Sequence, residues 1–103
     1  MARLLALPDP PTAVFAYSDE MAFAAMAHAR WSGRRVPEDL SVVGVDGHPL
    51  GDQVGVTTVD QDVAGQGRIA AELVVQLVSG AQVSDVDVPL RLVHRRSSGP
   101  APA

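Results

Sequence analysis

The chain has 103 residues, of which 47% are hydrophobic and 19% charged, with a net charge of −4 and no cysteine. This composition is typical of one small globular domain rather than a disordered segment. The acidic balance gives no basic footprint, so this segment is a poor candidate for gripping nucleic acid. The lack of cysteine excludes disulfides and thiolate metal sites. No stretch approaches the ~20 apolar residues of a membrane span, and the first seven residues are too short for a signal peptide.

The first half of the chain predicts two strands joined by a helix. Residues 12–17 and 40–45 are short apolar runs, each typical of a strand buried on both faces. Between them, Ser18 and the acidic residues after it predict a helix start, and the helix is expected to run from Asp19 to about Ser32 and to end at Gly33. Two strands with one helix between them form a βαβ unit with a right-handed crossover. The predicted fold class is therefore α/β with a parallel sheet and flanking helices.

The second half predicts further elements of the same kind. Residues 46–55 form a loop rich in glycine and aspartate, and residues 56–59 are a short third strand. Residues 62–79 have an amphipathic helical pattern. Residues 86–92 alternate as a half-buried strand does, with a proline that favours an edge position. We expect a frayed tail over residues 97–103.

Polar side chains follow each of the three predicted parallel strands. Ser18 and Asp19 come after the first strand, Asp46 after the second, and Gln61 and Asp62 after the third. Ligands of open α/β sheets bind at the carboxyl ends of the strands, so these residues are candidate ligand contacts. Simpler interpretations stay open. Ser18 or Asp19 would also serve as a helix cap, Asp46 as a turn former, and Gln61 as a helix-start residue.

Other polar residues carry weaker signals. The three histidines lack the spacing of metal ligands and are expected in solvent or in loops: His28, His48 and His94. Three arginines near the end are interpreted as an exposed strand edge protected against pairing: Arg91, Arg95 and Arg96. No phosphate loop, nucleophile elbow, zinc pattern or carboxylate pair with a base appears. We therefore expect no catalytic residue, metal or cofactor.

The predicted first helix has almost no polar stripe between Met21 and Trp31. A helix that is apolar all round is buried on more than one side. One face would cover the sheet, and the other would contact a second domain or a second copy of the chain. A helix whose outer face is simply rich in alanine is the alternative.

Four segments together resemble the sensor domain of the LacI/GalR family of transcription regulators. Residues 11–30 resemble its proline–threonine–alanine strand, polar turn and small-residue helix, and residues 34–51 contain the typical VPEDLSVVG-x-D block. Residues 57–80 resemble its third crossover and following helix, and residues 86–98 its closing strand. The resemblance covers the whole chain apart from the tail.

This resemblance implies part of a two-lobed fold of the periplasmic-binding-protein-like I class, without the helix-turn-helix head. Residues 1–60 would belong to the C-terminal lobe and residues 61–90 to the N-terminal lobe. Residues 91–97 would be a return strand, and residues 98–103 a disordered tail. The family pattern has asparagine where Ser18 stands and a second aspartate where Gly47 stands.

The resemblance also implies what the residues do. Asp46 holds the position of the acid that receives sugar hydroxyls, Gln61 that of the polar residue at the interlobe crossover, and Ser18 lies at the same edge. A homodimer interface is expected on the small-residue helix and the loop beyond the second strand: Met21, Phe23, Ala24, Ala27, Trp31, Pro49 and Leu50. The first expected partner is a small-molecule effector, which the resemblance implies is a sugar. The second is operator DNA, reached only through the absent head.

The expected function is effector sensing within a cytoplasmic, LacI-type DNA-binding regulator that contacts no membrane. Two alternatives stay open. The chain could be a fragment of a periplasmic sugar-binding protein, which shares the fold. It could instead be a standalone dimerisation module that pairs through the helix between Met21 and Trp31.

Overall fold

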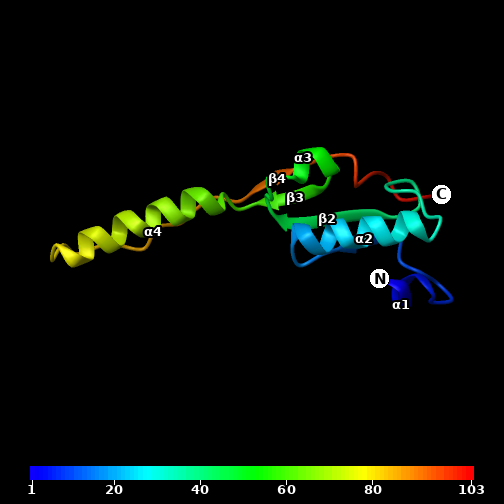
Figure 1. The fold of residues 1–103 in the computed structure, drawn as a ribbon, viewed down its shortest axis with the longest axis horizontal. Coiled ribbons are helices and arrows are strands. Elements are labelled where there is room, and N and C mark those ends of the chain that lie inside the picture. Colours follow the sequence, from blue (N-terminus) through cyan, green and yellow to red (C-terminus); the bar gives the residue numbers. More distant parts are fainter.

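The computed structural model describes all 103 residues. It contains one four-stranded sheet, flanked on one side by a long helix, and a second long helix that projects away from the sheet (Figure 1). In chain order the elements are α1 (Ala2–Leu5), β1 (Ala13–Phe15), α2 (Asp19–Trp31), β2 (Ser41–Asp46), α3 (Gly51–Val54), β3 (Thr57–Asp60), α4 (Val63–Val78) and β4 (Arg91–Val93).

The strands lie in the order β1-β2-β3-β4. The first three are parallel, with Val14 opposite Val42 and Val45 opposite Val59, and β4 runs antiparallel to β3. The predicted α/β class and parallel sheet are confirmed. β4 also has the edge position expected for the last strand. The short helix α3 was not expected, because the sequence pattern of residues 46–55 was interpreted as a loop.

Helix α2 begins and ends where the sequence predicts. The Ser18 hydroxyl accepts a hydrogen bond from the Met21 backbone N–H at 3.3 Å, and Gly33 follows the helix with a φ of +79°. One face carries Ala22, Met26 and Ala29, which are fully buried. Small side chains allow this helix to lie close to β2, where they join Leu40, Val42 and Val56 in the core.

Strand β1 is less buried than its apolar sequence predicts. Phe15 is 67% exposed and the following Tyr17 is 86% exposed. The prediction of burial on both faces is therefore wrong for this chain. Strand β1 lies at the edge of the sheet and pairs only with β2, so its outer edge has no strand neighbour.

Helix α4 has an N-terminal cap but is almost wholly exposed. The Asp62 carboxylate accepts a hydrogen bond from the Gly65 N–H at 3.1 Å, and Gly65 is the only buried residue of the helix. The molecule measures 60 × 23 × 21 Å, and its radius of gyration of 18.0 Å exceeds the ~13 Å of a compact domain of this length. No helix of the structure combines the length and hydropathy that crossing a bilayer requires.

The last two sequence predictions need correction. A strand over residues 86–92 is wrong, because only residues 91–93 pair with β3 and the segment before them runs beside α4 without a strand neighbour. The frayed tail is wrong for residues 97–99. Ser97 is fully buried and its hydroxyl donates to the Val42 carbonyl, while the Gly99 N–H donates to the Ser41 hydroxyl at 3.1 Å.

Candidate ligand-binding site

A polar cleft of about 810 Å³ lies where β2 and β3 end and α4 begins. It is lined by the loop after β2 and by the turn that leads into α4: Asp46, Gly47, His48, Pro49, Asp60, Gln61, Asp62, Val63 and Ala64. The cleft therefore occupies the carboxyl ends of two parallel strands, which is where open α/β sheets bind ligands.

Asp46 and Gln61 meet in this cleft, although fifteen residues separate them in the sequence. The Gln61 side-chain Nε2 donates to Asp46 Oδ1 at 2.7 Å. Only Oδ1 of Asp46 has a protein partner, so Oδ2 is available to accept a hydrogen bond from a ligand. Asp46 has a φ of +120°, and residues other than glycine hold such backbone conformations mostly at functional sites. The structure thus brings together two of the three predicted ligand contacts.

Asp60 also lines the cleft, and sequence reasoning did not single it out. Its Oδ1 accepts a hydrogen bond from the Asp62 backbone N–H and its Oδ2 accepts one from Arg91 Nη2, both at 2.9 Å. The backbone hydrogen bond from Asp62 and then the Arg91 guanidinium hold the pKa of Asp60 below its ordinary value. The only sequence signal for Asp60 is that it lies two residues before Asp62, the cap of α4, a spacing that is typical of a local turn.

Ser18 lies outside the residues that line the cleft, and its hydroxyl caps α2. Its neighbour Asp19 is fully buried and connects α2 to the cleft loop, because its Oδ2 accepts the His48 backbone N–H at 2.7 Å. The other oxygen, Oδ1, has no hydrogen-bond partner and lies against Gly44. A Cβ atom at position 44 would collide with that oxygen, so the close approach requires glycine. The sequence predicted a helix-start residue or a ligand contact at Asp19, and it gave no sign of this link between α2 and the loop.

His48 is ordered by local contacts rather than free in solvent. Its Nδ1 accepts the Leu50 N–H at 3.1 Å, and its ring lies edge-on to Phe23 with centroids 5.4 Å apart. His28 packs near Trp31, with ring centroids 5.9 Å apart. No group of three or more histidine, aspartate or glutamate side chains is arranged to hold a metal ion.

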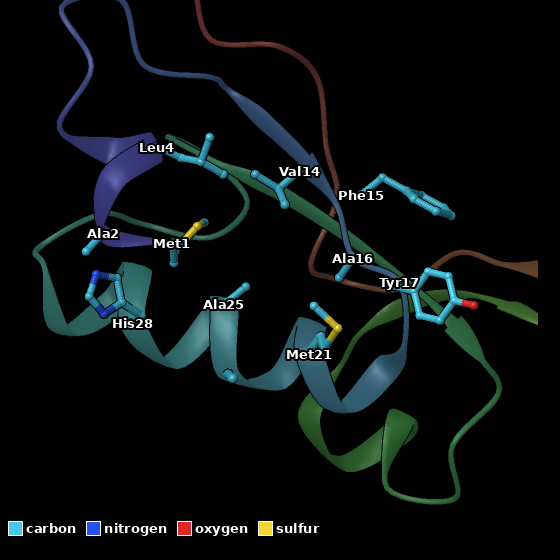
Figure 2. Close-up of a pocket in the computed structure, with 11 residues that line it drawn as sticks. Met1, Ala2, Leu4, Val14, Phe15, Ala16, Tyr17, Met21, Ala25 and His28 are labelled. Atoms are coloured by element: carbon cyan, nitrogen blue, oxygen red, sulfur yellow. The ribbon is translucent and has the colours of Figure 1, made fainter.

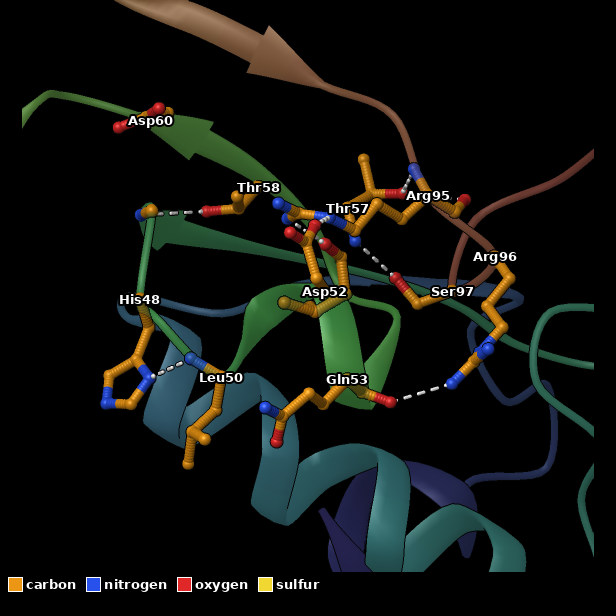
Figure 3. A network of polar contacts seen from close by, with 12 residues as sticks. His48, Leu50, Asp52, Gln53, Thr57, Thr58, Asp60, Arg95, Arg96 and Ser97 are labelled. Carbon is orange, nitrogen blue, oxygen red and sulfur yellow. Dashed lines mark hydrogen bonds and ion pairs between the residues drawn. The ribbon is translucent and has the colours of Figure 1, made fainter.

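Arg95 and Arg96 hold helix α3 in place rather than protecting an exposed strand edge against pairing (Figure 3). Arg95 Nε donates to Asp52 at 2.6 Å and its Nη1 donates to the Val56 carbonyl at 2.8 Å. Arg96 donates to the Gln53 carbonyl at 2.8 Å. The interpretation as edge protection is therefore wrong for Arg95 and Arg96, whereas Arg91 does lie exposed on the edge strand β4. Arg95 and Arg96 close the loop between β2 and β3 and so stabilise the wall of the cleft.

Comparison with known proteins agrees with this architecture. A family model for the periplasmic binding protein-like domain matches residues 1–98. The HTH-type transcriptional repressor CytR of Escherichia coli (strain K12) is 42% identical over 85 residues, which cover 81% of this chain and 25% of the relative. This chain belongs to the LacI family of transcriptional regulators.

Two solved LacI-family structures share the fold. A LacI transcriptional regulator from a Rhodococcus species superposes with a TM-score of 0.90 at 36% identity, over 99% of this chain and 39% of that one. A LacI family regulator from Enterococcus faecium, solved with bound ribose, has a TM-score of 0.88 at 28% identity, over 96% of this chain and 38% of that one. The chain therefore spans about a quarter of the curated relative's length and about two fifths of the chains in these structures. It is part of a LacI-family sensor domain.

The residues predicted for a LacI-family dimer interface lie partly on α2 and partly in the cleft loop. Met21 and Ala24 line an apolar groove of about 600 Å³ between α1, β1 and α2 (Figure 2). Phe23 instead contacts His48. Trp31, at the end of the helix, is 85% exposed. Pro49 and Leu50 follow His48 in the cleft loop, and both are exposed.

Proposed function

We propose that this chain is the effector-sensing part of a LacI-type DNA-binding regulator and forms one wall of its sugar cleft. The hydrogen bond between Gln61 and Asp46 carries the proposal. It presents a free carboxylate oxygen and an amide side by side at the end of the parallel strands. A carboxylate accepts strong hydrogen bonds from hydroxyl groups, and an amide both donates and accepts. Ribose, bound in the related Enterococcus faecium structure, offers such hydroxyls.

The shape of the chain supports a division between two lobes. Residues 1–60 form three of the four strands and helix α2, whereas α4 and the segment after it project from the end of β3 (Figure 1). We assign the projecting residues 61–90 to the N-terminal lobe and residues 91–97 to a strand that returns. The cleft would then lie at the crossover. An effector held there would favour one arrangement of the lobes over another.

The remaining parts of the proposal concern partners and place. The related repressor is described as HTH-type, and we assign operator contact to a head outside this chain. Reciprocal coupling between effector and operator is typically ~1–3 kcal/mol, or roughly 5–150-fold in affinity. We further propose a cytoplasmic homodimer that pairs through α2 and the cleft loop.

The deciding experiment uses the complete reading frame that contains this chain. Calorimetry with D-ribose and a panel of other neutral sugars should reveal a ligand, and Asp46→Asn should weaken its binding by about tenfold or more. Asparagine keeps the size of the side chain and tolerates a positive φ, so the fold is retained. Asp39→Ala removes a carboxylate outside the cleft and should leave binding unchanged.

Two results would contradict the proposal. Sugar binding that survives Asp46→Asn unchanged would exclude this cleft. A ligand that binds without altering the protein's affinity for DNA, measured by fluorescence anisotropy, would favour a transport-type binding protein instead.

A further inference from the structure

Asp60 lies at the last position of β3, where the chain leaves the sheet for α4. We propose that Asp60 is a positioning residue: its carboxylate holds the turn that directs Gln61 toward Asp46, and it thereby sets effector affinity without binding the effector. This inference rests on the function proposed above for the cleft.

The peptide group between Gln61 and Asp62 is held by two hydrogen bonds. Asp60 Oδ1 accepts the N–H of Asp62 at 2.9 Å, which is the hydrogen bond of an Asx-turn. Gln66 Nε2 donates to the Gln61 carbonyl oxygen of the same peptide group at 2.5 Å. With both polar atoms of this peptide group held, the Gln61 side chain reaches Asp46 at 2.7 Å. Asp62 adopts a left-handed conformation with φ +48° and ψ +56°, which aspartate tolerates in turns.

Arg91 fixes the direction of the Asp60 carboxylate. The two residues lie directly opposite each other in the antiparallel pair of β3 and β4, and Arg91 Nη2 donates to Asp60 Oδ2 at 2.9 Å. The Arg91 side chain is 76% exposed and that of Asp60 24% exposed. Because the guanidinium occupies one carboxylate oxygen, the other is directed at the turn. The outgoing and returning strands are joined at the same point.

Gly47 provides the space that the Asp60 carboxylate occupies. A Cβ atom at position 47 would collide with Asp60 Oδ1 and with the carbon that carries it. Gly47 directly follows Asp46, so the loop that carries one ligand contact is fitted to the residue that directs the other.

The test compares Asp60→Ala, Asp60→Asn and Gln61→Ala in the complete protein, with D-ribose as the calorimetric probe. Asp60→Ala should weaken binding by about fivefold to tenfold, the effect of losing one hydrogen bond to the ligand. Asp60→Asn keeps an acceptor for the Asp62 N–H and should restore most of the affinity. In a Gln61→Ala background, Asp60→Ala should have no further effect, because Asp60 acts only through Gln61.

The matched control is Asp39→Ala. Asp39 also accepts a backbone N–H and a guanidinium, both from Arg35, but it lies outside the cleft. Its removal should leave D-ribose affinity unchanged. An equal loss of affinity from Asp60→Ala with and without Gln61 would show direct contact with the effector and would overturn the positioning role.

Crystal structures of the unliganded wild-type protein and Asp60→Ala provide a readout that needs no ligand. The Gln61 amide should leave Asp46 in the variant and stay within about 2.5–3.2 Å in the wild type. An unmoved Gln61 would overturn the inference even if a sugar binds. If neither D-ribose nor another sugar binds the wild type, the proposed function fails, and the position of Gln61 still decides the role of Asp60.

Discussion

Gly47 shows how strongly one position of the cleft depends on its neighbour. Its φ is +74°, a conformation that glycine adopts freely, and the carboxylate of Asp60 fills the space beside it. Gly33 has a similar φ of +79°, but a Cβ atom added there would meet no other atom within 4 Å. The two glycines therefore separate the cost of backbone conformation from the cost of a steric clash.

We predict that Gly47→Ala destabilises the fold more than Gly33→Ala does. Gly33→Ala should cost about 1–2 kcal/mol, because it carries only the penalty of a left-handed alanine. Gly47→Ala should cost at least about 1 kcal/mol more, since Asp60 must also move. Urea denaturation of the two variants measures the difference. Equal losses would mean that Asp60 moves aside freely.

Asp39 provides a prediction about pH. The Arg35 side chain, and then the Arg35 backbone N–H, lower the pKa of Asp39 from 3.8 to about 2. A depressed carboxyl pKa stabilises the folded state above the unfolded pKa, and this stabilisation is lost as the pH falls through the folded value. NMR titration should therefore show the Asp39 carboxyl titrating near pH 2, and Arg35→Leu should raise its pKa only part of the way to 3.8, because the backbone N–H of residue 35 still donates to the carboxylate. A titration near 4 in the unaltered protein would show that the ion pair does not form.

At the scale of elements, α2 and α4 differ in what covers them. Helix α2 packs Ala22, Met26 and Ala29 onto β2, whereas α4 buries only Gly65 and leaves Val75 and Val78 exposed. An isolated helix of this length is marginal in water, because most helix stability in proteins comes from packing of the apolar face. The amphipathic pattern of α4 therefore calls for a covering surface outside the chain.

Hydrogen exchange measured by mass spectrometry on the 103-residue chain tests this difference. Peptides from α4 should exchange at least about tenfold faster than peptides from α2 and β2, since local opening requires little loss of buried contact. Adding the rest of the proposed sensor domain should slow exchange in α4 and leave β2 nearly unchanged. Equal protection of both helices in the isolated chain would contradict the prediction and would indicate that copies of the chain cover α4.

At the scale of the whole molecule, the extended shape is that of a part rather than of a compact unit. Only 16 of the 103 residues are buried, and the apolar side chains of β1 and α4 face solvent. Within the proposed regulator, the rest of the sensor domain would cover them, and the outer side of α2 would remain for a second protomer.

Trp31 tests that last assignment. Large aromatic residues at the centre of an interface typically contribute about 2 kcal/mol or more to association. Trp31→Glu should therefore weaken dimerisation of the complete protein by about 30-fold or more, as measured by analytical ultracentrifugation. The thermal stability of the Trp31→Glu variant should equal that of the unaltered protein when both are measured at a concentration where they are monomeric, because Trp31 is 85% exposed in the chain. An unaltered dimer constant would place the interface elsewhere.

The sequence by itself determined the α/β class, the parallel order of three strands and both ends of α2. These features depend on local signals, such as apolar runs of strand length, Ser18 as a cap and Gly33 as a stop, which act within a few residues. It also indicated the edge of the sheet where Asp46 and Gln61 meet, because the carboxyl ends of parallel strands share one edge.

Only the tertiary structure decided the contacts between distant residues. Three such contacts are the burial of Ser97 against β2, the hydrogen bond from His48 to Asp19 and the hydrogen bond from Arg95 to α3. They join residues that lie about 29 to 55 positions apart, and no local pattern encodes them. The prediction of a strand over residues 86–92 failed because strand formation also depends on a distant neighbour. The alternating pattern of these residues is a property of the sequence, but a strand forms only where a neighbouring strand accepts its hydrogen bonds, and this chain offers one only from Arg91 onward.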